Sequence, residues 1–581
     1  MTTLDWAVLG VYLVGIVGFG VWSGRGNRKI DDFFLAGREM RWWAVGLSVM
    51  ATQISAITFV GTTGQAYTDG MRFLVVYFGL PFAMVILCMT LVPFFYRARV
   101  YTAYEYLERR FDARTRTLTS LAFLVSRGMA VGVTLYAPSL VLSVILGWTE
   151  SMTILLMGGT TIAYVFYGGN RSVIWTDVVQ MAIIWFGIFL CLGVAIAQMP
   201  PSVGLRDALS VAQATNRLRI VDTSTDLTSY TLWSGLIGGL FLMLSYFGCD
   251  QSQVQRYLSG SSLTQSRLSL LFNAFLKVPM QFMILLTGVL VFVFYHFHAQ
   301  PLLWNEVALH RLERAAPAAD LAAVRARFEA AQASRRAAVD AFVAARRAGG
   351  PADPAPYLAA QKELDDSRRA AVILLSQVTA PEQEPALLRA VFSALGMKRA
   401  GYNDTNYIFP TYVVSHLPNG LSGLVIAVIF AAAMSTLAGE FNSLATASVV
   451  DFYKRFVRPD GGDAHDLLVS RLFTAFWGMF GCVIALQAGR LGSAIEVVNR
   501  FGSYFYGSIL GVFALAVFVK RAGGVAASLG LGAGMVIVYL VSRFTPVHFL
   551  WWNVVGAASV FVVGSLIAVV EPRVDGPPPS A

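Results

Sequence analysis

Charged residues are scarce in this chain. Asp, Glu, Lys and Arg make up 13% of its 581 residues, whereas 56% are hydrophobic, and soluble domains carry about 25% charged residues. With a mean hydropathy of +0.61, the chain is too apolar to be a soluble globular protein. We therefore predict an all-α protein that crosses a lipid bilayer many times.

Cysteine and histidine are also rare, with four and six copies. The cysteines, at positions 88, 191, 249 and 482, fall within apolar stretches and lack the spacing of metal ligands. We interpret them as packing residues rather than as a disulfide framework. No HExxH motif or other catalytic constellation is present, so we predict that the protein is not an enzyme. A channel is not favoured either, because we find neither a continuous polar stripe nor a filter ring.

About thirteen apolar stretches are long enough to cross a bilayer, which takes roughly 20 residues. Their approximate ranges are 5–23, 42–67, 71–96, 117–146, 150–168, 173–198, 230–257, 269–297, 419–450, 467–487, 493–519, 522–543 and 549–570. The longer stretches imply tilted or kinked helices.

Basic residues gather in every second loop between these stretches. They are Arg25, Arg28, Lys29, Arg38 and Arg41; Arg97, Arg99, Arg109, Arg110, Arg114 and Arg116; Arg171; Arg267; Lys454, Arg455 and Arg458; and Lys520 and Arg521. By the positive-inside rule, this pattern predicts an outer N-terminus and a cytoplasmic C-terminus in a bacterial-type inner membrane. The net charge of +10 is then a topology signal with some attraction to anionic lipid, and no nucleic-acid partner is predicted.

One long segment, residues 298–410, is not apolar enough to span and is predicted on the outer side. It is rich in Ala, Arg and Glu, and Leu321, Val324 and Phe328 recur at helical spacing. A Gly-Gly-Pro sequence at 349–351 breaks the run, so we expect a helical hairpin. We favour a solvated insertion without essential function over a lid or a partner-binding element.

The most unusual apolar stretch is Gly46–Gly64, because it carries polar groups that a lipid-facing helix avoids. These are Thr52, Gln53, Ser55, Thr58, Thr62 and Thr63. Irregular backbone survives in a membrane only where protein or a cavity surrounds it, so one interpretation is an interrupted helix that lines an ion or solute site. The other is an ordinary helix that packs through small residues.

A second stretch, residues 430–451, favours the interrupted helix, since it carries two hydroxyls three and four residues after an alanine. Residues at these spacings share one helix face. Where the two stretches cross, they would offer an uncharged cage of carbonyl and hydroxyl oxygens from Ala51, Ile54, Ala432, Ser435 and Thr436. Such a cage suits a hard monovalent cation better than a transition metal.

Four segments carry a family resemblance: FFLAGREMRWWAVGLSVMATQISAITFVG (33–61), YGGNRSVIWTDVVQ (167–180), SYFGCDQSQVQRYL (245–258) and LPNGLSGLVIAVIFAAAMSTLAGEFNSLATASVVDFYKR (417–455). Together they resemble the sodium:solute symporters, which include the sodium/glucose, sodium/proline, sodium/iodide and sialic acid transporters. The resemblance implies that the five cage residues form the sodium site, with sodium as co-substrate.

The resemblance also implies the LeuT-type fold, which consists of two inverted five-helix repeats with extra helices at the ends. The first helix of each repeat would be broken, in Gly46–Gly64 and around Ser245–Gly248. We divide the chain into a first helix and cytoplasmic loop (1–41), the first repeat with the start of the second (42–297), the outer insertion (298–410), the rest of the second repeat (411–519), and two peripheral helices with a short tail (520–581).

The resemblance further suggests substrate-binding residues: Ser55, Thr58, Tyr77, Arg127, Tyr246 and Lys277. Tyr246 matches an aromatic residue that gates the inner side of the substrate pocket, and a core aromatic is the alternative. Lys277 aligns with a sugar-contacting lysine of galactose carriers, although a snorkelling lysine is equally compatible. Sugar binding is put in doubt because Thr58, Tyr77 and Leu80 replace the Gln, Glu and Ser of galactose carriers.

Arg127 lies in the core helix from which an arginine holds the substrate carboxylate in sialic acid carriers. A guanidinium offers bidentate geometry to a carboxylate, so this residue favours an acidic substrate. Pairing of Arg127 with an internal acid, or snorkelling to the inner face, are the alternatives.

Asp177 matches a residue that lies near the inward exit route of sodium in the family, and a helix N-cap is the alternative. A second sodium site known in some relatives needs hydroxyls shortly after Ser435 and Thr436. Ala438 and Gly439 stand there, so we predict a single sodium ion.

These features predict a secondary active, sodium-coupled symporter that imports a small polar organic solute by alternating access. A carboxylate-bearing solute, such as a sialic acid or a monocarboxylate, is favoured. A sodium/sugar symporter, a proton-coupled carrier and a non-transporting receptor of the same fold are the alternatives. The oligomeric state is not predicted.

Overall fold

The computed structural model describes residues 2–349, 352–378, 402–487 and 494–571, and these residues form helices and connections without a β-strand. The first half holds α1 (Thr3–Ser23), α2 (Ile30–Leu35), η1 (Ala36–Arg38), α3 (Trp42–Gln53), η2 (Ile57–Gly61), α4 (Thr62–Asp69), η3 (Gly70–Tyr77), α5 (Leu80–Met89), α6 (Leu91–Ala98), α7 (Ala103–Arg110), α8 (Ala113–Leu146), α9 (Glu150–Ala197), α10 (Leu205–Ala214), η4 (Ser234–Gly238), α11 (Gly239–Cys249), α12 (Gln251–Leu258) and α13 (Leu263–Phe297). The second half holds α14 (Glu306–Ala315), α15 (Ala318–Arg347), α16 (Ala355–Val378), α18 (Thr405–His416), α19 (Leu421–Ala447), η5 (Ser448–Val457), α20 (Asp463–Gln487), α21 (Ala494–Phe518), α22 (Gly524–Phe544) and α23 (Phe549–Val570).

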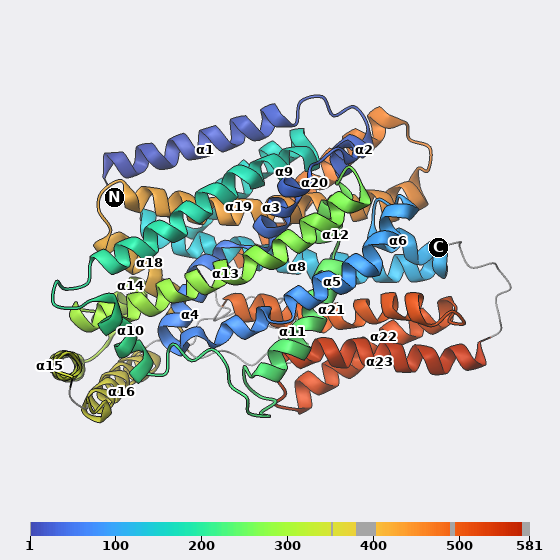
Figure 1. Cartoon of the computed structure of the whole chain (residues 1–581). Helices are drawn as coiled ribbons and strands as arrows, with labels where there is room; N and C mark the ends of the chain where they lie inside the picture. The colour runs from blue at the N-terminus through green and yellow to red at the C-terminus, as the bar shows by residue number, and fades with distance from the viewer. Residues whose placement is uncertain (1, 350–351, 379–401, 488–493, 572–581) are drawn as a thin grey trace.

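Long apolar helices run side by side through the molecule (Figure 1). In the described part of the chain, ten are long and apolar enough to cross a membrane, so the protein is an integral membrane protein. The expected number was about thirteen. Three places account for the difference. Ile57–Met89 counts as one span, the apolar helix Ser234–Cys249 is too short to be counted, and α9 counts as one span.

The helix α9 joins two stretches, 150–168 and 173–198, that the sequence suggested as separate spans. It continues through a kink at Gly169, whose φ of 54° and ψ of −151° lie outside the helical region. A Cβ at this position would lie 2.4 Å from the Phe33 carbonyl oxygen. Only glycine tolerates both the backbone angle and the close approach, so the chain turns here without a loop.

A helix is interrupted inside the molecule at Ile54. The helix α3 ends at Gln53, and Ile54 leaves the helix with φ −95° and ψ 86° before η2 begins as a π-helical turn. This confirms the interruption predicted within Gly46–Gly64.

The second interruption lies at Asp250, between α11 and α12, and not around Ser245–Gly248 as predicted. The side chain of Asp250 accepts a hydrogen bond from the Ser252 amide at 2.9 Å and so caps α12. The Ser245 hydroxyl donates to the Phe241 carbonyl within the same helix, and this stretch therefore stays helical.

The helix α19 forms the centre of the bundle and packs against α9, α8, α1 and α3. Every residue from Val425 to Ala447 is buried. The helices α22 and α23 pack on α21, and many of their large apolar side chains are exposed. The four cysteines are buried and none forms a disulfide, as expected for packing residues.

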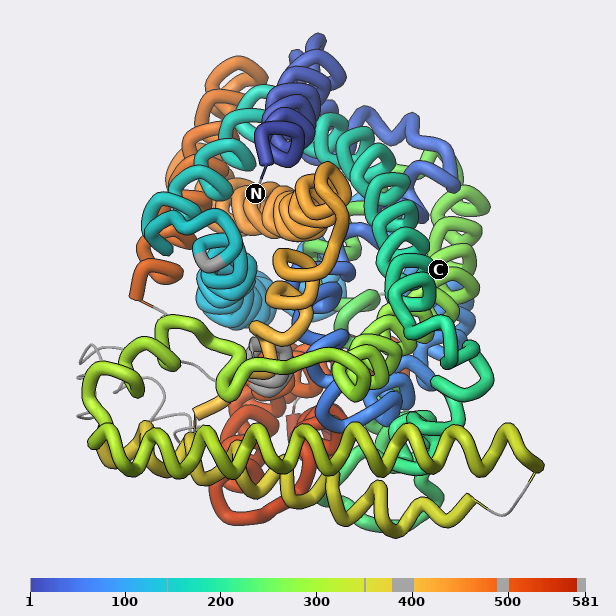
Figure 2. The backbone as a smooth tube through the Cα atoms, turned by 90° about the vertical axis from the view of Figure 1, so that its left-hand side faces the viewer, coloured from blue at the N-terminus to red at the C-terminus, as the bar shows by residue number. Residues whose placement is uncertain are grey.

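The predicted helical hairpin is present as α15 and α16, which cross one end of the bundle (Figure 2). Its residues Leu321, Phe328, Ala331, Leu364 and Ala371 form an apolar cluster together with residues of α14 and of the connection before it. Residues 379–401 of the predicted insertion lie outside the described residues. The helix α1 begins at the same end as the hairpin, and α23 ends at the opposite end (Figure 1).

Side chains of the hairpin also bond to the backbone of the last turn of α13 and of the connection that leads to α14. The acceptors are the carbonyl oxygens of residues 295, 297, 300, 301 and 302, and the donors are Gln332, Arg335, Arg336 and Arg368. The bond from Arg335 to the Tyr295 carbonyl measures 2.6 Å, and both side chains are buried. These hydrogen bonds attach the hairpin to the bundle. The expected solvated insertion is therefore also a docked one.

Candidate functional site

The break in α3 lies against the middle of α19, and this contact gathers the predicted cage residues. The Ser435 hydroxyl lies 3.2 Å from the Ala51 carbonyl oxygen and 3.1 Å from the Ala432 carbonyl oxygen. The Thr436 hydroxyl donates to Ala432 at 3.2 Å. Ile54 stands at the break itself. All five residues are buried.

The donor set of this cage is entirely neutral. Two hydroxyls and the carbonyls of a terminated helix supply oxygen atoms without charge, which suits a hard monovalent cation. The Ser435 hydroxyl bridges α19 to α3 through the Ala51 carbonyl, whereas the Thr436 hydroxyl bonds within α19. A cation in the cage would replace these bonds and connect the same two helices.

Asp177 is buried in the interior of α9, beyond the Gly169 kink. The alternative that it caps the start of a helix is therefore wrong. The Ser48 hydroxyl donates to one of its carboxylate oxygens at 2.5 Å. Ser48 precedes Ala51 by three residues and shares its face of α3, so the carboxylate lies about one helical turn from the cage.

A guanidinium occupies the space beside Gly439 on α19. A Cβ at Gly439 would lie 2.6 Å from Nη2 of Arg256, and Arg256 also interacts electrostatically with Asp177. The positions where some relatives place hydroxyls are thus next to a fixed positive charge.

A cavity of about 110 Å³ adjoins the cage. The following residues line it: Thr52, Gln53, Ser55, Ile57, Thr58, Val76, Tyr77, Arg127, Thr134, Leu242, Met243, Tyr246, Thr436, Glu440 and Tyr506. Five of the six predicted substrate residues are among them. Because Thr436 belongs both to the cage and to this pocket, the two sites share a residue.

Lys277 is the predicted substrate residue that does not line the pocket. It is fully buried in α13, and its Nζ lies 5.1 Å from the centre of the Tyr77 ring. Burial contradicts the snorkelling alternative. The lysine instead supports the pocket wall from behind Tyr77.

Arg127 lies in the pocket wall, but two internal carboxylates hold it. It forms salt bridges with Asp250 and, at 3.1 Å, with Glu440. The Tyr506 hydroxyl lies 2.6 Å from one guanidinium nitrogen, and the Tyr246 ring lies 5.4 Å from the guanidinium carbon. We call Arg127, Asp250 and Glu440 the pocket cluster. The alternative that Arg127 pairs with an internal acid is confirmed.

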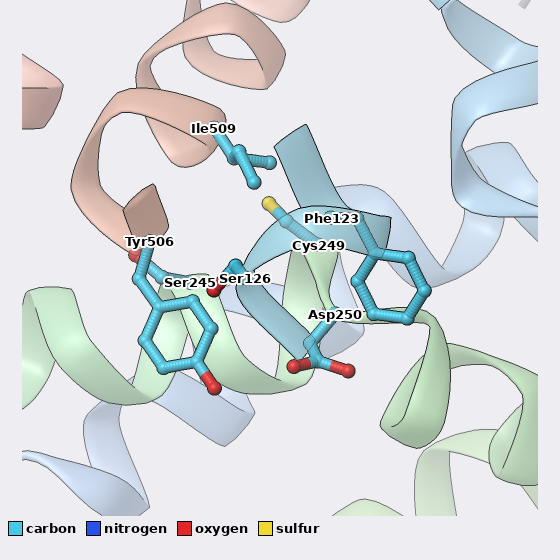
Figure 3. A pocket seen from close by; sticks show the side chains of 7 residues that line it. All are labelled: Phe123, Ser126, Ser245, Cys249, Asp250, Tyr506 and Ile509. Atoms are coloured by element: carbon cyan, nitrogen blue, oxygen red, sulfur yellow. The ribbon is translucent and has the colours of Figure 1, made fainter. Parts of the chain in front are cut away.

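A second, smaller cavity lies on the other side of Asp250 and Tyr506. Figure 3 shows its lining residues, which come from α8, α11 and α21 and from the break at Asp250. Tyr506 lines both cavities. Of the pocket cluster, Asp250 lines the smaller cavity, whereas Arg127 and Glu440 line the larger one.

Comparison with known proteins identifies this arrangement. The sequence pattern of the sodium:solute symporter family matches residues 33–317 and 388–534. The chain belongs to the sodium:solute symporter family.

Characterised relatives of this symporter are transporters. It is 27% identical to a sodium/sialic acid symporter of Aliivibrio fischeri, over 97% of this chain and 93% of the relative. It is 26% identical to a sodium/glucose cotransporter of Vibrio parahaemolyticus, over 94% and 86%. The protein is thus similar to sodium-coupled symporters along nearly its whole length.

A solved structure shares the fold of this symporter. It represents a substrate-bound, outward-open Na⁺-coupled sialic acid symporter, with a TM-score of 0.74 and 24% identity over 98% of this chain and 99% of that one.

Sequence reasoning missed Asp250, Glu440 and Tyr506 of this symporter. A signal for two of them was present, because Glu440 lies in a predicted span and Asp250 lies in another. Ionisable residues inside a span are functional candidates by default. For Tyr506 the sequence carries no comparable signal.

Proposed function

We propose that this sodium-coupled symporter binds one sodium ion in the cage and imports a small polar organic solute through the adjoining pocket. The observation that carries this proposal is Thr436, which contributes to both sites. Sodium that draws α3 and α19 together would fix one wall of the pocket. Coupling between the two ligands is then reciprocal.

The transport mechanism would be alternating access in a LeuT-type fold with about thirteen spans and two inverted repeats. The two interrupted helices, at Ile54 and Asp250, support this assignment. Asp177, next to α3 and the cage, would mark the inward route of sodium. An inside-negative potential drives each inward positive charge by ~2.3 kcal/mol per 100 mV.

The membrane would be a bacterial-type inner membrane, with the N-terminus outside and the C-terminus in the cytoplasm. The basic residues in alternate loops support this orientation. In that orientation the hairpin and the start of α1 lie on the outer side, at the same end of the bundle (Figure 1).

A single sodium ion is favoured by the surroundings of Gly439. A guanidinium from Arg256 already lies beside this position, and neither Ala438 nor Gly439 has a side-chain oxygen. A second cation would meet electrostatic repulsion there.

For the solute, the residues that would bind it are Ser55, Thr58, Tyr77, Arg127 and Tyr246, with Lys277 behind Tyr77. Sialic acids are the first compounds to test, because they are the named substrates of relatives similar to this chain. Monocarboxylates follow, since Arg127 can bind a carboxylate if its internal partners rearrange.

The test is uptake into proteoliposomes that contain the purified protein. An inward sodium gradient should drive accumulation of labelled solute, and an equal potassium gradient should not. Accumulation driven only by a proton gradient would identify a proton-coupled carrier, and binding without accumulation would identify a receptor.

A further inference from the structure

The pocket cluster contains two carboxyl groups and one guanidinium, so it carries a surplus negative charge when both acids are ionised. Asp250 is satisfied within the protein: one oxygen accepts from Ser252, and the other pairs with Arg127. Glu440 is not. Its Oε1 pairs with Arg127, but its Oε2 has no hydrogen-bond partner in the described part of the chain.

This free oxygen belongs to a side chain that is 2% exposed and lines the pocket. A buried carboxylate oxygen without a partner is costly, and such atoms in native proteins call for an explanation. The amide oxygen of Gln53, which also lines the pocket, lacks a partner as well. Two residues that line one cavity thus each carry an acceptor without a partner.

The pocket offers little to balance this charge. Among the described residues that line it, Arg127 is the one basic side chain, and both of its terminal nitrogens are engaged. A solute that brings only a carboxylate would therefore face a surplus negative charge. A solute that brings hydrogen-bond donors and a positive charge would complete the cluster.

We propose that Glu440 binds a protonated amine of the transported solute, which makes the substrate an amine-bearing solute. An ammonium group supplies three donors and offsets the surplus charge. A solute with both an amine and a carboxylate inserts between Glu440 and Arg127, so that every charge keeps an opposite partner. This inference rests on the proposed sodium-coupled transport through the same pocket.

The position of Glu440 also connects the amine to sodium. Glu440 follows Thr436 by four residues, so both side chains lie on one face of α19, one turn apart. The same carboxylate is able to hold a second sodium ion instead of an amine. The experiment below separates these two cations.

The experiment measures sodium-driven uptake by proteoliposomes with matched pairs of solutes: alanine and lactate, serine and glycerate, glucosamine and glucose. In the parent protein the amine member of at least one pair should be taken up at least about tenfold faster, since a buried acceptor left unpaired disfavours the analogue. In Glu440→Gln this preference should fall to within about twofold. Sodium-dependent thermal stabilisation without solute should persist in Glu440→Gln, because the cage is intact.

Glu363→Gln is the matched control, because Glu363 lies on the hairpin and its ion pair with Arg327 is half exposed. It should keep the amine preference of the parent.

If the parent transports an acid or a sugar with sodium but no amine, or if Glu440→Gln keeps the preference, the inference is wrong and the proposed function stands. A sodium-to-solute ratio that falls by one in Glu440→Gln would assign the carboxylate to a second sodium ion and also overturn it. Absence of sodium-driven uptake of every solute would instead contradict the proposed function.

Discussion

Two buried arginine–carboxylate clusters lie along α8, and they differ in how completely they are satisfied. In the inner cluster, Asp451 accepts from the Thr102 hydroxyl and Arg116 Nε through one oxygen and from the Ser120 hydroxyl through the other, each at 2.8 Å. Glu108 holds another nitrogen of Arg116 at 2.7 Å. In the pocket cluster, one oxygen of Glu440 has no partner among the described residues.

This difference indicates a structural role for the inner cluster and a binding role for the pocket cluster. A fully satisfied buried network fixes the helices that contribute to it, and the inner cluster joins α7, α8 and η5 in this way. A cluster with a free acceptor beside a cavity is complete only when a ligand is present. The two clusters also differ in charge and burial, because Arg455 gives Glu108 a second basic partner and Glu108 is partly exposed, whereas the pocket cluster has one guanidinium for two buried carboxylates. Hydrogen bonding and charge balance together therefore distinguish the two clusters.

The largest effect is expected for Arg116→Met, which breaks the inner cluster. Asp451 is fully buried, and removing its cationic partner leaves a charge that should lower stability by about 3–5 kcal/mol. Thermal unfolding of the purified protein measures the loss. Arg114→Met, at an exposed position on the same helix, should unfold like the parent, and an equally stable Arg116→Met protein would refute the structural role.

The second effect concerns the neutral cage, which has no ion pair at all. The double variant Ser435→Ala, Thr436→Ala removes both side-chain oxygens and should abolish sodium-dependent stabilisation, which amounts to ~2.7 kcal/mol at a sodium concentration 100 times Kd. Sodium stimulation of uptake should disappear with it. Ser443→Ala, two turns along α19, should retain both, and sodium dependence in the double variant would place the cation elsewhere.

A smaller change is expected for Arg127→Lys in the pocket cluster. Lysine keeps the charge but has one nitrogen where arginine uses two terminal nitrogens to reach Asp250, Glu440 and Tyr506. The protein should therefore lose about 1–3 kcal/mol of stability. Uptake of a carboxylate-bearing solute should fall at least about tenfold. Unchanged uptake of the true substrate in this variant would show that Arg127 does not bind the substrate.

The smallest effect is expected at an exposed pair, Arg347 and Asp207, 2.6 Å apart. Arg347 lowers the pKa of Asp207, so this contribution is present above the ordinary carboxyl pKa and is lost as the pH falls through the lowered pKa of the folded state. Arg347→Ala should cost less than ~1 kcal/mol at neutral pH, and the two proteins should converge in acid. A difference that grows in acid would contradict the assignment.

The sequence predicted features that depend on local pattern. Polar residues inside apolar stretches located the break at Ile54 and the hydroxyls of Ser435 and Thr436. Alternating basic loops and apolar runs located most spans.

Features that depend on distant contacts were not predictable. Arg127 and Glu440 are 313 residues apart, and no local pattern shows that they pair. The break at Asp250 was misplaced by a few residues because the Asp250 side chain caps the start of α12, whereas the small residues before it stay within α11. The turn without a loop in α9 depends on the close approach of Phe33 to Gly169.

The docked hairpin also has a practical consequence for imaging. Membrane proteins of this size show few features beyond the detergent micelle, so their particles are hard to align in electron micrographs. Here a 30-residue helix, α15, about 45 Å long, lies across one end of the bundle (Figure 2). Because Arg335 and Arg336 of α15 bond to backbone carbonyls at the end of α13, α15 should keep its orientation relative to the transport core and serve as a built-in alignment marker.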